Sequence, residues 1–183
     1  MTGQVACDEV SIVAGHTGYP DQVRQQSRKG RRLKGARGRG TLAKEKPPIF
    51  GMIERGGQVV IRMVENVKHV TIRPLIEATI EPGTCVSTNE YDIYSRLESW
   101  GYARQSVNHS QGEYARDDDG DGFHEVHGNT IEGFWSLLRS WLRPHRGISQ
   151  EQLPLYLNFF AFIHNARKRG KALLHSLIQV LVT

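Results

Sequence analysis

GNTIEGFWSLLRSWLR, residues 128–143, is the stretch around which this chain of 183 residues is organised. On a helix with about 100° per residue, its polar side chains fall on one narrow stripe. The stripe contains Asn129, Glu132, Ser136, Arg139 and Arg143. The rest of the circumference is apolar: Ile131, Phe134, Trp135, Leu138, Trp141 and Leu142. We therefore expect a mostly buried helix whose polar stripe opens onto a cleft. A glutamate there, close to two guanidinium groups, suits a metal ligand at a phosphate site.

Glu132 also fits a purely structural role. Asn129 is followed three residues later by Glu132, which matches a capping pattern with Asn129 as the N-cap and Glu132 at the third helical position. The spacing by itself leaves the capping role and the catalytic role open.

The positive charge of the chain is concentrated in one segment. The net charge is +5, and residues 24–46 hold ten Lys and Arg but one acid. Residues 15–46 read as a long loop rich in Gly, Arg and Lys, with too few apolar side chains to be buried. Such a loop would contact nucleic-acid phosphates without reading the base sequence, although a merely solvated loop is the alternative. The nucleic-acid contacts we expect are Arg28, Lys29, Arg31, Arg32, Lys34, Arg37, Arg39 and, at the end of the helix, Arg143.

The cysteines and the terminal segments indicate the cellular compartment of the protein. Cys7 and Cys85 form no C-x-x-C pair, so neither a disulfide framework nor a zinc site is expected. The N-terminus lacks the pattern of a signal peptide, and the apolar patch near residues 173–182 is too short and polar to span a membrane. We therefore expect a cytoplasmic protein with no membrane partner, and nucleic-acid binding through the basic loop would make it nucleoid-associated.

Strand and helix patterns alternate along the chain. Strands are expected at 4–14, 84–89 and 102–109, a β-hairpin at 47–67, and helices at 70–80, 92–100, 150–169 and 171–182. Pro74 is expected in the first turn of its helix. This order predicts an α/β fold with a mixed sheet. Asp8 and Glu9 interrupt the first strand, which is unfavourable unless a site uses them or the strand lies at an edge. The run at 117–125 reads as an exposed acidic turn, because a calcium loop would require Glu where Gly128 stands.

Several segments of this sequence resemble those of one known family. They are CDEVSIVAGH, PPIFGMIERGGQVVIRMV, STNEYDIYSRLESWGY, GEYARDDDGDGF and HGNTIEGFWSLLRSWLRPHRGIS, and they cover roughly residues 4 to 172. The chain is similar to the DDE transposases of bacterial insertion sequences, in particular the ISXO2-like catalytic domain. This resemblance implies a ribonuclease-H-like mixed sheet flanked by helices, with a helical C-terminal part. It also implies Mg²⁺-dependent DNA cleavage and strand transfer.

The resemblance assigns the site residues one by one. The first catalytic aspartate falls on Asp8, the third acid on Glu132, and the basic residue two turns later on Arg139. The second aspartate falls on Asn89. Together Asp8, Asn89 and Glu132 would hold Mg²⁺ (or Mn²⁺).

The asparagine is a departure from the family pattern. Asn89 offers a carbonyl oxygen without negative charge, so it would hold a divalent ion more weakly and slow the reaction. Neither neighbouring acid is a good replacement, since Glu90 should face the other side of the strand and Asp92 lies three residues further on.

The same resemblance predicts the domain organisation and the partners. Residues 1–172 would be the catalytic domain, with a basic loop at 22–46, followed by a C-terminal helical tail at 173–183. We expect the N-terminal zinc-ribbon module usual in such enzymes to be absent. The expected partners are transposon ends and target DNA, with a homo-oligomer on DNA. The alternatives are a catalytically inactive DNA-binding remnant and, on the same fold, a nuclease that acts on RNA.

Overall fold

The computed structural model describes residues 1–15, 42, 45–89, 92–107, 115–116, 126–127, 129–145 and 147–170. Most of the expected basic loop, the acidic turn at 117–125 and the expected helix at 171–182 lie outside these residues. No helix within the described ranges is long and apolar enough to cross a membrane.

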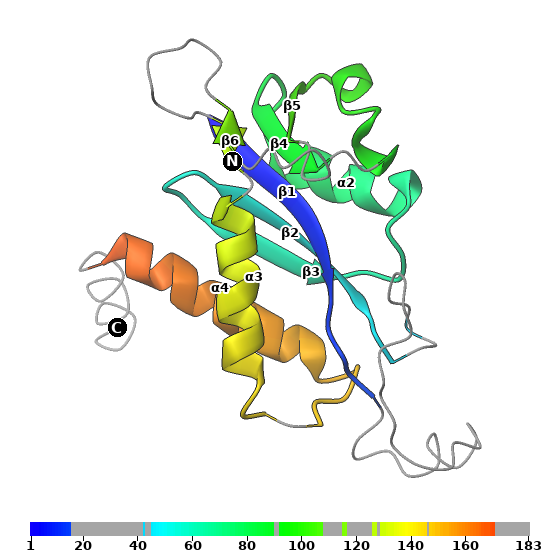
Figure 1. Cartoon of the computed structure of the whole chain (residues 1–183), viewed down its shortest axis with the longest axis vertical. Coiled ribbons are helices and arrows are strands. Elements are labelled where there is room, and N and C mark those ends of the chain that lie inside the picture. The colour runs from blue at the N-terminus through cyan, green and yellow to red at the C-terminus, as the bar shows by residue number, and fades with distance from the viewer. Residues whose placement is uncertain are drawn as a thin grey trace, which may run out of the picture.

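A five-stranded mixed sheet forms the centre of the molecule (Figure 1). Its strands are β1 (Gln4–Ser11), β2 (Pro48–Glu54), β3 (Val59–Met63), β4 (Cys85–Asn89) and β5 (Ala103–Val107). They lie in the order β3-β2-β1-β4-β5. β2 runs antiparallel to both β1 and β3, whereas β4 runs parallel to both β1 and β5. The expected α/β class is confirmed, and this strand order is consistent with a ribonuclease-H-like fold.

Helices cover both faces of the sheet. One core, here the α2 core, joins β1 to Ile72 and Ile76 of α2 (His69–Thr79). The other, here the α3 core, joins the opposite face to α3 (Asn129–Leu142) and α4 (Leu153–Arg169). A short hairpin of β6 (Ala115–Arg116) and β7 (Val126–His127) leads into α3, and β7 contacts β5.

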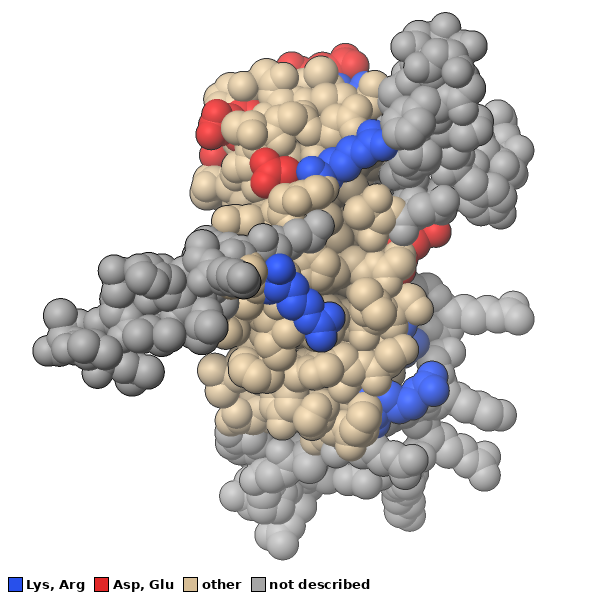
Figure 2. Space-filling model, turned by 90° about the vertical axis from the view of Figure 1, so that its left-hand side faces the viewer, with Lys and Arg blue, Asp and Glu red and all other residues tan. Residues whose placement is uncertain are grey.

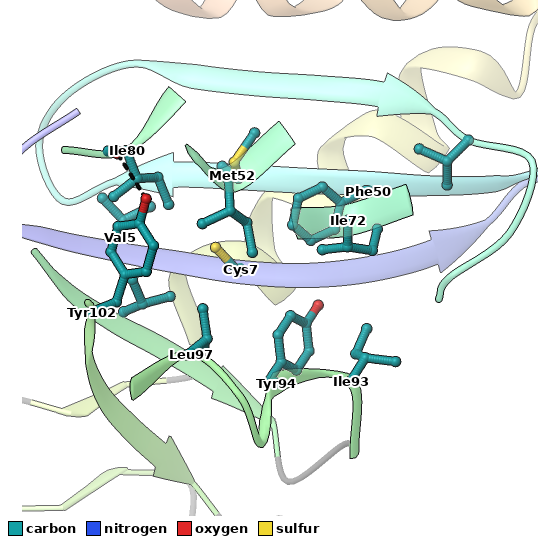
Figure 3. Packing of buried hydrophobic residues seen from close by; sticks show 13 residues of the cluster. Val5, Cys7, Phe50, Met52, Ile72, Ile80, Ile93, Tyr94, Leu97 and Tyr102 are labelled. Carbon is teal, nitrogen blue, oxygen red and sulfur yellow. Dashed lines mark hydrogen bonds between the residues drawn. The ribbon is translucent and has the colours of Figure 1, made fainter. Parts of the chain in front are cut away.

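Strand β1 contributes to both cores because successive side chains point to opposite faces. Val5 and Cys7 are buried in the α2 core, whereas Val10 is buried in the α3 core. Figure 3 shows Cys7 of β1 among the packed side chains of the α2 core. Burial, and to a lesser degree the neighbouring Asp8, raises the pKa of the Cys7 thiol. The thiol is therefore protonated and serves packing.

Two local expectations were wrong. Residues 92–100 form two 3₁₀ turns, η2 (Asp92–Tyr94) and η3 (Glu98–Trp100), in place of one α-helix. Backbone bonds from Leu97 to the Tyr94 carbonyl and from Trp100 to the Leu97 carbonyl join residues three apart, and this tighter winding still buries Tyr94 and Leu97 completely.

Pro74 lies inside α2, because that helix begins at His69. A proline there removes the hydrogen bond to the carbonyl of Val70. Val70 is 85% exposed, so water can satisfy that carbonyl.

Two neighbouring leucines of α3 test this packing. Leu138 is completely buried and Leu137 is 60% exposed. We expect Leu138→Ala to lower the free energy of unfolding by about 2–5 kcal/mol through lost burial and the cavity left behind. Leu137→Ala should change it by no more than about 0.5 kcal/mol. Urea denaturation of both variants measures the difference, and equal losses would contradict this orientation of α3.

Candidate active site

The site is built around Asp8, in the middle of β1. β1 is the central strand, and Asp8 points toward α3, where Trp135 donates its indole N–H to Asp8 Oδ2 at 2.9 Å. Asp8 is half-buried and Trp135 is 3% exposed. An indole nitrogen donates a hydrogen bond and cannot accept one, so the Asp8 carboxylate is the acceptor. Asp8, the first acid predicted for the site, is therefore held by a side chain of α3, the helix that also carries Glu132.

A glycine of β2 makes room for this contact. Gly51 is the register partner of Asp8, and a Cβ atom at Gly51 would overlap atoms Cζ2 and Cη2 of the Trp135 ring. The indole thus lies directly on the backbone of β2 beside Asp8. Glycine inside a strand often marks such a close approach.

The orientation of α3 follows from its aromatic contacts. Phe134 packs against Phe160 and His164 of α4, with ring centroids 5.4 and 5.2 Å apart. Trp135 faces β1 instead. Glu132 lies about 60° beyond Trp135 around the helix, and Arg139 about 40° beyond it, both on the side away from Phe134. Glu132 and Arg139 therefore lie on the side of α3 away from α4, and both are exposed.

The register of β4 brings Asn89 level with Asp8. Cys7 pairs with Thr88 in the parallel neighbour β4, and Asp8 and Asn89 are the next residue of each strand. Neighbouring strands lie about 4.8 Å apart. This describes the backbone of Asn89, whose side chain lies outside the described part of the structure.

Further polar groups lie on the same face of the sheet, two residues before Asp8 and Asn89 along the strands. Ala6 and Ser87 pair with each other and line a small hollow together with Thr130 at the start of α3. Gln105 of β5 pairs with Ser87, and its side-chain oxygen is buried without a hydrogen-bond partner among the described residues. A buried acceptor of this kind is normally satisfied by water or a ligand.

The polar stripe of α3 is wider than the sequence suggested. The stripe residues Glu132, Ser136 and Arg139 are exposed, but so are Gly133 and Leu137. The helix buries one side and opens broadly on the other, where the sequence predicted a mostly buried helix. Arg143 lies in the turn after α3 and is exposed. The expected DNA contacts Arg28, Lys29, Arg31, Arg32, Lys34, Arg37 and Arg39 fall outside the described residues.

The second acid of β1 faces the other side of the sheet. Tyr94 donates its hydroxyl to Glu9 Oε2 at 2.9 Å, and burial, followed by the neighbouring Glu9, raises the pKa of Tyr94. Glu9 is therefore separated from Asp8 by the strand itself and does not share its site.

Comparison with known proteins identifies the family of the chain. The family of ISXO2-like transposase domains matches residues 3–165. The chain belongs to this family. A protein of Halobacterium salinarum described as an uncharacterized protein in transposable element ISH50 is 34% identical over 182 residues, which are 98% of this chain and 58% of that protein. A transposase-like protein of Haemophilus influenzae is 29% identical over 97 residues, which are 52% of this chain and 71% of that protein. No solved structure matches the chain.

This family implies a divalent metal, and the oxygen ligands here fit one in type. Carboxylates and amide oxygens are the hard ligands that Mg²⁺ prefers. The charge is lower than three acids would supply, and among the described residues no group of three His, Cys, Asp or Glu side chains is placed to hold a metal ion. In donor chemistry alone, the side chains of Asp8, Glu132 and Asn89 suit a divalent ion.

Sequence reasoning missed Trp135, which it counted among the apolar side chains. Two signals were available. A buried indole N–H requires an acceptor, and a glycine inside the apolar run PPIFGMIE marks a close backbone contact. Together they identify an aromatic side chain resting on β2.

Gly51 provides a direct test of this contact. We expect Gly51→Ala to lower the free energy of unfolding by about 1–3 kcal/mol, because the added methyl group must displace the Trp135 ring. Gly133 in α3 is the matched control, since open space surrounds its missing Cβ. Gly133→Ala should raise the free energy of unfolding by about 0.5–1 kcal/mol through helix propensity. Chemical denaturation measures both, and a Gly51→Ala variant as stable as the parent would show that the ring lies elsewhere.

Proposed function

We propose that this chain is the catalytic domain of an insertion-sequence transposase. Its reaction is hydrolysis of a DNA phosphodiester bond, followed by attack of the freed 3′-OH on target DNA. The observation that carries the proposal is the hydrogen bond from Trp135 to Asp8, which joins the acid of the central strand to the helix that bears Glu132. Membership of the transposase family supports the reaction class.

The residues of the proposed site would have two roles, metal binding and phosphate binding. Asp8, Asn89 and Glu132 would hold Mg²⁺ or Mn²⁺, and a divalent ion at a phosphate activates the attacking oxygen and stabilises the leaving one. Arg139 lies on the same side of α3 as Glu132, where its guanidinium can bind a phosphate oxygen of the DNA. Arg143, one turn further on, extends this positive charge along the path of the DNA.

Asn89 favours an impaired enzyme. Replacing one of three carboxylates by an amide removes one of the negative charges that hold the ion, so we expect weak metal binding and slow cleavage. The second candidate function follows from the same residue: a transposase remnant that binds DNA without cutting it.

Restoring the carboxylate separates the two functions. We expect Asn89→Asp to raise the rate of DNA cleavage by several orders of magnitude, because it restores a charged metal ligand beside Asp8. The assay measures strand cleavage with Mg²⁺ or Mn²⁺ on DNA that contains the ends of the element.

Controls make this result specific. Adding Asp8→Asn or Glu132→Gln to the revertant should abolish its cleavage, whereas Glu9→Gln, on the other face of β1, should leave the metal dependence unchanged. Efficient cleavage by the unaltered chain would remove the argument for impairment. If the revertant binds DNA but never cuts it, the assignment of the site is wrong.

The DNA contacts we propose come mainly from the basic loop. Figure 2 shows one face of the body, on which described Lys and Arg side chains stand apart from one another on a mostly uncharged surface. Residues 24–46, by contrast, hold ten Lys and Arg. We infer that this segment binds DNA independently of its base sequence. We also infer that copies of the chain assemble on the transposon ends and the target DNA.

The salt dependence of binding tests the loop. Replacing its seven proposed DNA-binding side chains by serine should weaken binding to any duplex and lower the slope of log K against log salt by about 0.9 for each phosphate that is no longer neutralised. The replaced residues are Arg28, Lys29, Arg31, Arg32, Lys34, Arg37 and Arg39. Arg73→Ser on α2 is the control, because Arg73 pairs with Glu77 on the opposite face of the sheet. Fluorescence anisotropy at several salt concentrations gives the slopes, and an unchanged slope for the loop variant would exclude the loop as the main DNA-binding segment.

A further inference from the structure

We propose that Trp135 is a positioning residue of the metal site: its indole N–H holds the Asp8 carboxylate in the orientation that receives the divalent ion. This inference rests on the proposed function and adds to it a residue that itself touches neither metal nor DNA. Hydrogen-bond partners behind metal ligands fix the orientation of those ligands and support their affinity for the metal.

The donor is rigidly held. Trp135 is almost completely buried, its ring lies on the backbone at Gly51, and Phe134 packs against it edge-on at 5.5 Å. The hydrogen bond to Asp8 Oδ2, at 2.9 Å, is of ordinary length for a good N–H donor. A side chain confined in this way limits rotation of the carboxylate, so Asp8 does not have to be ordered when the ion binds.

The chemistry of the donor suits this role. An indole N–H carries no positive charge and no lone pair available to a metal, so it neither cancels the charge of Asp8 nor competes for the ion. A Lys or Arg at the same place would neutralise the carboxylate. An ionised carboxylate accepts several hydrogen bonds or metal contacts at once, so one N–H on Oδ2 leaves capacity for an ion.

The same bond links Asp8 to the helix that carries Glu132. Trp135 follows Glu132 by three residues on one helix, so fastening the indole to β1 prevents α3 from sliding along the strand. Loss of the N–H should therefore loosen the geometry of Asp8 and its spacing to Glu132 together.

An isosteric replacement tests the role without removing the ring. In a chain carrying Trp100→Phe and Trp141→Phe, Trp135 is the one remaining tryptophan, and growth on 3-benzothienylalanine replaces its N–H by sulfur in a ring of nearly the same shape. Mn²⁺ affinity is measured by electron paramagnetic resonance of the free ion, in this background and with Asn89→Asp added. The matched control is the same background with ordinary tryptophan.

We expect the sulfur analogue to bind Mn²⁺ about tenfold or more weakly than its control, with the far-ultraviolet circular dichroism unchanged. Trp135→Phe in the otherwise unaltered chain should show the same direction of change, which covers the case in which the double Phe background fails to fold. Without metal, the Trp135 indole N–H signal in nitrogen–proton correlation spectra should shift when Asp8 is replaced by alanine.

The outcomes separate this inference from the function on which it rests. If Asp8→Asn lowers Mn²⁺ affinity but the sulfur analogue binds as tightly as its control, Trp135 is merely structural and the metal site stands. If Asp8→Asn leaves Mn²⁺ binding unchanged, or neither the background nor its Asn89→Asp form binds Mn²⁺, the proposed site itself is wrong and the inference fails with it.

Discussion

One hydrogen bond across two layers of the molecule, from Trp135 on α3 to Asp8 on β1, organises the rest of the structure. Each partner would be unfavourable alone. A buried indole N–H without an acceptor costs about 1–3 kcal/mol, and a carboxylate in the central strand of a sheet loses hydration. Paired, each satisfies the other, and α3 is fixed to β1 in direction and in register.

This pairing places strict demands on its neighbours. The indole can reach Asp8 only because Gly51 has no side chain, so the composition of β2 is set by its packing against a helix much further along the chain. On the opposite face, Tyr94 pairs with Glu9 in the same way. Both acids of β1 are therefore met by aromatic donors, one from each layer. This explains how the central strand carries two adjacent acids without lying at an edge of the sheet.

The sequence predicts this fold in outline and the site only in part. Periodicity and turn residues located β1, the hairpin of β2 and β3, β4 and β5, because these signals are local. The sequence did not predict the two 3₁₀ turns at residues 92–100, because apolar residues at 93, 94 and 97 suit an α-helix equally well. The role of Trp135 escaped because a helical wheel treats an indole as apolar surface and ignores its N–H. The choice of Asp8, Asn89 and Glu132 came from family resemblance, since no local pattern indicates whether residues so far apart in the sequence lie together.

The environment of Asp8 also gives a physical reason for the fold to tolerate Asn89. Position 89 is level with Asp8 on the neighbouring strand, and two carboxylates at that separation repel each other unless a cation lies between them. The donor that holds Asp8 is a neutral indole, which does nothing to offset a second negative charge. An asparagine at position 89 avoids this repulsion. Under the proposed function, we therefore expect the domain to be more stable without metal than its Asn89→Asp variant and to hold the ion more weakly, which is the stability–activity trade-off expected where like charges converge at an active site.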